Sequence, residues 1–218
     1  MKKLIYQNPL ASPADIAGFR LEGKARLSFE AGAMEMKNSL DPSPGQNANF
    51  VLWCPEEFPR DVEISWRFSP VKEPGLCILF FAARGIDGQD VFAQSLRPRD
   101  GEYPQYHSGD INCFHVSYFR RMWEDERSFH TCNLRKSKGF HLVCQGADPL
   151  PGAEDSKGFY EMKIEKKGRN IRFYMESLLI FDYTDDGSLG DVPGGGKIGF
   201  RQMAPLVGRY KDLRVYEI

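Results

Sequence analysis

The chain has no long apolar segment and almost no excess charge. No stretch approaches the roughly 20 apolar residues that a membrane-spanning helix needs, and the apolar run behind Lys2 and Lys3 is too short for a secretory signal. The formal net charge of -1 gives no general attraction to nucleic acid or to an anionic membrane. We therefore predict a cytoplasmic protein without a membrane or nucleic-acid partner, in which any electrostatic specificity is local.

Paired cysteines and other metal or phosphate motifs are also missing. The cysteines are odd in number and form no C-x-x-C pair, which favours buried, reduced thiols: Cys54, Cys77, Cys113, Cys132 and Cys144. Asp182, Asp185 and Asp186 lack the alternating spacing of a calcium loop. The triple glycine at 194–196 precedes neither a helix nor a Lys-Ser/Thr pair, as a phosphate loop requires. The sequence thus predicts no metal and no cofactor.

Long helical patterns are scarce, and strand patterns fill the chain. Residues 61–68 alternate between polar and apolar, as a strand with one buried face does, whereas residues 76–83 are continuously apolar and predict a central strand covered on both faces. Residues 15–19 and 123–127 favour short helices. Further strands are predicted at 25–30, 33–37, 49–54, 114–121, 131–136, 141–145, 159–166, 171–175, 178–183, 197–201 and 211–218. Many short strands joined by Gly/Pro turns predict one all-β domain over 1–218, a two-sheet antiparallel jelly-roll sandwich.

Residues 106–146 differ from the rest of the chain in composition. They hold all four histidines together with several aromatic and cationic side chains. Their motifs Y-H-S-G-D-I-N, S-Y-F-R-R and T-C-N-L-R-K-S-K-G-F-H-L, with F-V-L-W-C-P-E-E-F-P and I-G-F-R-Q-M-A-P elsewhere, closely resemble the YesU-like family of bacterial proteins over essentially the whole chain. The resemblance implies a jelly roll of the concanavalin-A-like lectin/glucanase type. It also implies a role with carbohydrate, since a member of the family is associated with a gene set for the use of pectin, particularly rhamnogalacturonan; it brings no established reaction.

Sugar recognition requires aromatic faces for pyranose rings, planar polar groups for hydroxyls and, for acidic sugars, Arg or Lys. Tyr103 and Trp123 are aromatic candidates for packing against a sugar ring. The residues that we predict to bind the sugar in a groove over a concave sheet are Tyr106, Tyr118, Arg120, Asn133, Arg135, His141 and Arg201.

The strand predicted at 114–121 presents alternate residues on opposite faces. Tyr118 and Arg120 therefore share one face, and His115, Phe119 and Arg121 share the other. Because Phe119 suits a core, we expect Tyr118 and Arg120 in the groove, although alternation alone does not decide which face lines it.

Catalysis is left open by the sequence. A lyase that abstracts the C5 proton of a uronide needs a group that neutralises the carboxylate, a base and an acid. Asn133 and Arg135 could neutralise the carboxylate, and the candidates for proton transfer are His115, Tyr118 and His141. No E-x-D-x-x-E run is present for glucanase chemistry, and the acids of residues 123–127 have the wrong spacing for it.

The leading hypothesis is a protein that binds, and could process, acidic or rhamnose-containing pectic oligosaccharides. The first alternative is a polysaccharide lyase or glycoside hydrolase that acts on pectin or rhamnogalacturonan fragments. The second is a non-catalytic scaffold for protein interaction. The identity of the sugar and the oligomeric state are not decided by the sequence.

Overall fold

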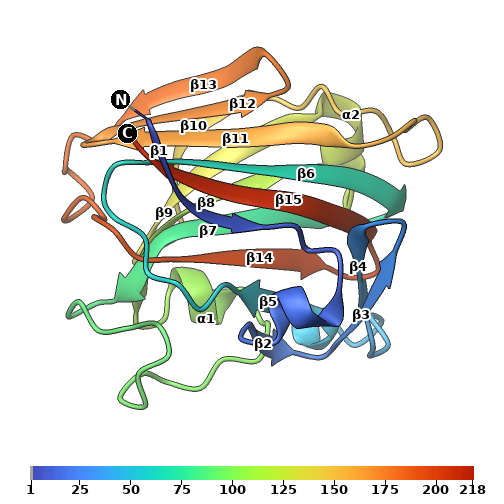
Figure 1. Ribbon diagram of the computed structural model, residues 1–218, viewed down its shortest axis with the longest axis horizontal. Helices are drawn as coiled ribbons and strands as arrows, with labels where there is room; N and C mark the ends of the chain where they lie inside the picture. Colours follow the sequence, from blue (N-terminus) through green and yellow to red (C-terminus); the bar gives the residue numbers. More distant parts are fainter. Residues whose placement is uncertain (1) are drawn as a thin grey trace.

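The computed structural model describes residues 2–218, which fold into two antiparallel sheets packed face to face (Figure 1). The larger sheet runs in the order β13-β12-β11-β6-β15-β4-β3, and β1 pairs with β15. Its strands are β1 (Lys3–Asn8), β3 (Ala25–Glu30), β4 (Ala33–Asn38), β6 (Val62–Lys72), β11 (Tyr160–Lys167), β12 (Asn170–Met175), β13 (Leu178–Thr184) and β15 (Val207–Glu217). The predicted jelly-roll class is confirmed.

The smaller sheet runs in the order β10-β9-β8-β7-β14-β5-β2 and lies behind the larger one in Figure 1. Its strands are β2 (Arg20–Gly23), β5 (Phe50–Trp53), β7 (Leu76–Gly85), β8 (Ile111–Tyr118), β9 (Thr131–Ser137), β10 (His141–Ala147) and β14 (Lys197–Met203). The helices are short: η1 (Pro13–Ile16), η2 (Gln46–Ala48), α1 (Pro104–His107) and α2 (Glu124–Phe129). None of the helices within residues 2–218 has the length and apolar character needed to cross a bilayer.

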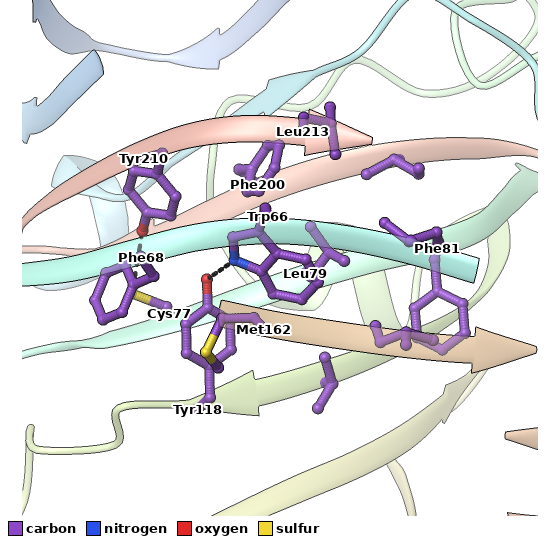
Figure 2. Close-up of a cluster of buried hydrophobic side chains, with 14 of the residues drawn as sticks. Trp66, Phe68, Cys77, Leu79, Phe81, Tyr118, Met162, Phe200, Tyr210 and Leu213 are labelled. Atoms are coloured by element: carbon purple, nitrogen blue, oxygen red, sulfur yellow. Dashed lines mark hydrogen bonds between the residues drawn. The ribbon is translucent and has the colours of Figure 1, made fainter. Parts of the chain in front are cut away.

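The core between the sheets is built from the inward faces of both. Trp66 on β6 packs against Tyr118 on β8 and Phe200 on β14, with ring centroids 5.7 and 6.1 Å away, and Trp66 Nε1 donates a hydrogen bond to Tyr118 Oη at 3.1 Å (Figure 2). The alternation predicted for residues 61–68 is confirmed, since Trp66 and Phe68 are fully buried while Arg67 is exposed.

A second apolar cluster lies on the outer face of the smaller sheet. Trp53 on β5 and Phe80 on β7 pack beneath Tyr106 of α1, and the segment 86–110 covers them. Strand β7 is therefore covered on both faces, as its continuous apolar run predicts. The segment covers only part of the outer face, and a cavity lies on the same face beside α1.

Two strands and two short helices were not anticipated, and one of these helices is η2. Strand β1 pairs with β15, but its residues are mostly exposed and carry no alternating pattern. Strand β2 is only four residues long, and α1 lies in a segment whose Pro and Gly content predicts a loop. The short helices expected at 15–19 and 123–127 correspond approximately to η1 and α2.

Candidate functional site

A cavity of about 470 Å³ opens on the outer face of the smaller sheet. Arg201, Ile78, Ser117 and Asn133 lie opposite one another in a single row across β14, β7, β8 and β9, and they form its floor. The walls come from the segment around α1, the turn before β10, η2 and the α2 insertion, which is the segment between β8 and β9 that contains α2. The full lining is Gln46, Leu76, Ile78, Tyr103, His107, Ser117, Arg120, Trp123, Asp125, Glu126, Asn133, Arg135, Phe140, Arg201 and Met203.

Arg201 is a buried cation without an acidic partner among residues 2–218. Its side chain is 1% exposed, and its Nη2 donates to Gln46 Oε1 and to the Gly101 carbonyl, each at 3.3 Å. Its guanidinium carbon lies 4.6 Å from the centre of the Tyr103 ring, and its Nε is buried without a hydrogen-bond partner. Burial lowers the pKa of Arg201 to about 10. A charge held in this way favours an anion in the cavity.

Arg135 is a second cation that makes no ion pair within the described residues. Its Nη1 donates to the Phe140 carbonyl at 3.0 Å, and its guanidinium carbon lies 3.7 Å from the centre of the Phe140 ring. Burial, with a smaller repulsion from Arg120, lowers the pKa of Arg135. Arg135 and Arg201 therefore bring uncompensated positive charge to one cavity.

Arg120, by contrast, is neutralised. Its Nη2 lies 2.7 Å from Glu126 Oε1, and its Nη1 donates to Thr131 Oγ1 at 2.7 Å. The other oxygen of Glu126 accepts from the backbone N–H groups of Met122 and Trp123 at 3.1 and 3.3 Å. This network holds the α2 insertion against the cavity and fixes the backbone that carries Trp123, whose side chain stays half exposed.

Three titratable rings meet at the α1 side of the cavity. The rings of Tyr103 and His107 are edge to face with centroids 4.8 Å apart, and Tyr103 Oη lies 3.4 Å from His115 Nδ1. His115 is 1% exposed behind Tyr103 and stacks on Phe80, and its Nε2 is buried without a partner. Burial lowers the pKa of His107 and holds the pKa of His115 well below its ordinary value, while burial raises the pKa of Tyr103.

Four of the predicted binding residues, Arg120, Asn133, Arg135 and Arg201, line this cavity together, as do Tyr103 and Trp123. Asn133 is nearly buried. Its amide oxygen accepts a hydrogen bond from Arg120 Nη1 at 3.2 Å, and its amide nitrogen donates to the Cys132 carbonyl at 3.2 Å. These contacts hold the amide of Asn133 in place at the edge of the floor.

The prediction that Tyr118 lies in the groove is wrong. Its side chain points into the core between the sheets, where Trp66 donates to it (Figure 2). Strand β8 ends at Tyr118, and Phe119 has a φ of 47°, in the left-handed region. This break in the alternation sends Tyr118 and Phe119 into the same core and Arg120 to the opposite side. His115 and Ser117 face outward, on the same face of β8 as Ile111 and Cys113 of the outer apolar cluster.

Three more of the predicted residues do not line the cavity: Tyr106, predicted to bind the sugar, His115, a candidate for proton transfer, and His141, predicted for both roles. Tyr106 belongs to the covering segment and points inward, completely buried, so that its ring stacks on Phe80 and its hydroxyl accepts from the Gly101 N–H at 3.0 Å. His141 lies against Gly139 in the turn before β10 and does not line the cavity. His115 reaches the cavity only through Tyr103, since the tyrosine ring covers it.

Sequence reasoning gave no role to several lining residues, including His107, Gln46, Ser117 and Phe140. His107 had a signal, because Tyr103 and His107 are four residues apart around Pro104, a spacing that places both on one face of a helical turn. Gln46 had none, because it reaches the cavity from a loop far away in sequence. No cluster of three or more His, Cys, Asp or Glu side chains among residues 2–218 is arranged to hold a metal ion.

Comparison with known proteins shows close relatives. The chain is 50% identical over 214 residues to the uncharacterized protein YesU of Bacillus subtilis (strain 168), covering 98% of this chain and 95% of YesU. It also matches the crystal structure of a protein of unknown function with a galectin-like fold from Bacillus subtilis, with a TM-score of 0.94, 49% identity, and coverage of 99% of this chain and 96% of that chain.

More distant structures share the fold alone. The carbohydrate-binding module CBM66 from Bacillus subtilis has a TM-score of 0.56 at 11% identity, with 90% of this chain and 93% of that chain covered. The Bacillus licheniformis beta-glucanase has a TM-score of 0.61 at 12% identity, with 99% and 98% covered. The family described as "Domain of unknown function (DUF1961)" matches residues 3–215. Because this match and the similarity to YesU both span nearly the whole chain, the protein belongs to the DUF1961 family.

Proposed function

We propose that the protein binds acidic or rhamnose-containing pectic oligosaccharides in the cavity on the smaller sheet. The observation that carries this proposal is the pair of cations, Arg135 and Arg201, that share the cavity without acidic partners among residues 2–218. Arg135 is partly buried and Arg201 fully buried. Two further arginines with buried side chains are paired, Arg99 with Glu22 and Arg121 with Asp148. A carboxylate on the ligand would supply the missing counter-charge and accept hydrogen bonds from guanidinium N–H groups.

The rest of the lining suits a sugar ring. Tyr103 and Trp123 bring aromatic surface to the cavity, and the apolar face of a pyranose packs well on such rings. Ser117 and Asn133 on the floor offer a hydroxyl and an amide, which can both donate to and accept from sugar hydroxyls. The cavity thus combines charge for an acidic group with polar and aromatic surface for the rest of a saccharide.

Similarity to other proteins supports a carbohydrate ligand. The fold is shared with a carbohydrate-binding module and with a beta-glucanase. The association of one member of the YesU-like family with pectin use supports the choice of a pectic sugar. The cysteines are unpaired and four of the five are buried, which suits the reducing compartment that we propose for the protein, the cytoplasm.

Glycoside hydrolysis is less compatible with this lining. Asp125 and Glu126 are the carboxylates that line the cavity, and they are neighbours on α2. Glu126 is held by Arg120 and by two backbone N–H groups, so its oxygens are already occupied. Hydrolysis needs two carboxyl groups that flank the scissile bond, and these two acids do not supply such a pair.

Calorimetric titration with de-esterified oligogalacturonate and with rhamnogalacturonan oligosaccharides tests the proposal. We expect heat of binding with the acidic sugars and none with the same sugars after their carboxyl groups are reduced to alcohols. Arg135→Gln should weaken binding by about tenfold or more, because a hydrogen bond to a charged group contributes about 1.5–3 kcal/mol. Arg67→Gln, an exposed arginine on the larger sheet, is the matched control. Absence of heat, or equal binding of the reduced sugars, would contradict the proposal.

A further inference from the structure

Two neighbouring side chains at the α1 wall are suited to proton transfer. Tyr103 and His107 are one helical turn apart, the His107 N–H donates to the Tyr103 carbonyl at 3.2 Å, and both side chains line the cavity. His107 Nδ1 lies 2.7 Å from Ser108 Oγ, and Nε2 has no hydrogen-bond partner within residues 2–218. When Nδ1–H donates to Ser108, Nε2 carries the free lone pair.

The same cavity contains the cations that such chemistry requires. Arg201 lies against the face of the Tyr103 ring, and Arg135 packs on Phe140, whose ring also contacts His107 with centroids 4.4 Å apart. A carboxylate bound by Arg135 and Arg201 therefore lies close to both Tyr103 and His107. Neutralising that carboxylate acidifies the adjacent carbon and stabilises the negative charge that develops when its proton is removed.

From this arrangement we infer that the cavity is the active site of a β-eliminating lyase for 4-linked uronates, with His107 as the base and Tyr103 as the acid. The inference rests on the proposed binding of an acidic saccharide. His107 Nε2 takes the C5 proton, the electron pair of that C–H bond forms the C4=C5 double bond, and the C4–O bond breaks. Tyr103 donates its phenol proton to the departing oxygen. The imidazolium and phenolate then exchange a proton through solvent, so that no water is added to the products and no oxidant is needed.

The environment of the two rings agrees with these roles. Burial and the charges of Arg135 and Arg201 lower the pKa of His107, so its imidazole is neutral and basic at neutral pH. Burial raises the pKa of Tyr103 against the opposing effect of the same two arginines, so its phenol keeps its proton. The lowered pKa of His107 suits a base, and the raised pKa of its neighbour Tyr103 suits an acid. His115 is a positioning residue, with Nδ1 3.4 Å from Tyr103 Oη.

The test combines binding, product and pH measurements on the full chain with de-esterified oligogalacturonate and rhamnogalacturonan oligosaccharides. Cleavage should produce the ultraviolet absorbance of unsaturated uronides, and the fragment masses should sum to the mass of the substrate. Tyr103→Phe and His107→Asn should each lower kcat by about 10²–10⁴-fold, the usual contribution of general acid–base catalysis, while calorimetry still detects binding. His130→Asn, at an exposed position beyond α2, is the control and should keep the rate.

The pH profile separates a chemical role of His107 from a structural one. The titratable and charged groups that face it are Tyr103, His115, Arg135 and Arg201. The rate should fall on the acid side as His107 is protonated, and His107→Asn should remove that limb. Binding without unsaturated product, fragments that have gained one water, or undiminished rates in both variants would each overturn the lyase inference and leave the binding proposal standing. Failure of every acidic sugar to bind would overturn both.

Discussion

Arg120 Nη2 lies 2.7 Å from Glu126 Oε1, and this contact joins the segment after β8 to the α2 insertion. The Glu126 side chain is 2% exposed, and its second oxygen accepts from two backbone N–H groups at the start of α2. One carboxylate therefore pairs with a cavity cation and also caps the helix. The position of Trp123 at the cavity rim depends on this carboxylate, because Trp123 is one of the residues that it holds.

Replacement of Glu126 by alanine should lower the free energy of unfolding by about 3 kcal/mol, because it leaves Arg120 without its partner in a largely buried position. It should also weaken sugar binding, since the insertion that carries Trp123 loses its anchor. Denaturant unfolding and calorimetry measure the two effects. Glu124→Ala, an exposed position on the same helix, should have little effect on either. Equal stability losses in the two variants would show that the Arg120–Glu126 contact is not important.

Arg201→Met should stabilise the protein and impair its binding. The substitution removes a buried cation that has no acidic partner within residues 2–218, and we expect the free energy of unfolding to rise by about 1–2 kcal/mol. Affinity for acidic sugars should fall by at least tenfold. The comparison is Arg121→Met, because Arg121 is equally buried but pairs with Asp148 at 3.0 Å. That variant should lose about 3–5 kcal/mol. Destabilisation of similar size in both variants would contradict the account of Arg201.

Tyr118→Phe should affect stability and leave binding unchanged. The lost hydroxyl accepts from Trp66 Nε1 in the core, and a buried N–H without a partner costs about 1–3 kcal/mol. Because the ring lies between the sheets and away from the cavity, affinity for the acidic sugars should stay within about twofold of the wild type. Unfolding by denaturant and calorimetric titration of the same sample check both expectations. A tenfold loss of affinity in a folded variant would show that Tyr118 contributes to the binding site after all.

The sequence predicts the fold well because most of its strands are covered on one face. Polar and apolar residues alternate along such strands, and this alternation identifies them. Strand β6 is an example, with Trp66 and Phe68 buried on either side of exposed Arg67. The same reasoning fails where the backbone departs from extended geometry. The left-handed φ of Phe119 reverses the side on which the following residues lie, and a pattern of residue types does not reveal a single dihedral angle.

The site was only partly predictable for a related reason. Arg135, Asn133 and Arg201 lie on regular strands, and their residue types were enough to name them as candidates. Gln46 reaches the cavity from η2 and Tyr103 from the residue before α1. Their mutual contact, Tyr103 N–H to Gln46 Oε1 at 2.9 Å, spans 57 residues of sequence. Such contacts depend on how loops fold over the sheet, which has no local signal in the sequence.

His115 should make the protein less stable in mild acid. Burial, with the charges of Arg135, Arg201 and His107, holds the pKa of His115 well below 6.5, its ordinary value, and Tyr103 covers the ring. Below about pH 6.5, His115 therefore binds a proton in the unfolded chain but stays unprotonated in the folded chain. The stabilising contribution is complete above that pH and is lost as the pH falls towards the folded pKa, at about 1.4 kcal/mol per pH unit. His107 adds a smaller effect in the same direction.

His115→Phe isolates this contribution, because the phenyl ring keeps the stacking on Phe80 and removes the titrating group. We expect the free energy of unfolding of the wild type to fall between about pH 8 and about pH 5, and the slope to be shallower by up to about 1.4 kcal/mol per pH unit in the variant. Denaturant unfolding at a series of pH values measures both slopes. Parallel slopes for the wild type and His115→Phe would mean that His115 is protonated as readily in the folded chain as in the unfolded one, and that the ring is not sealed from water behind Tyr103.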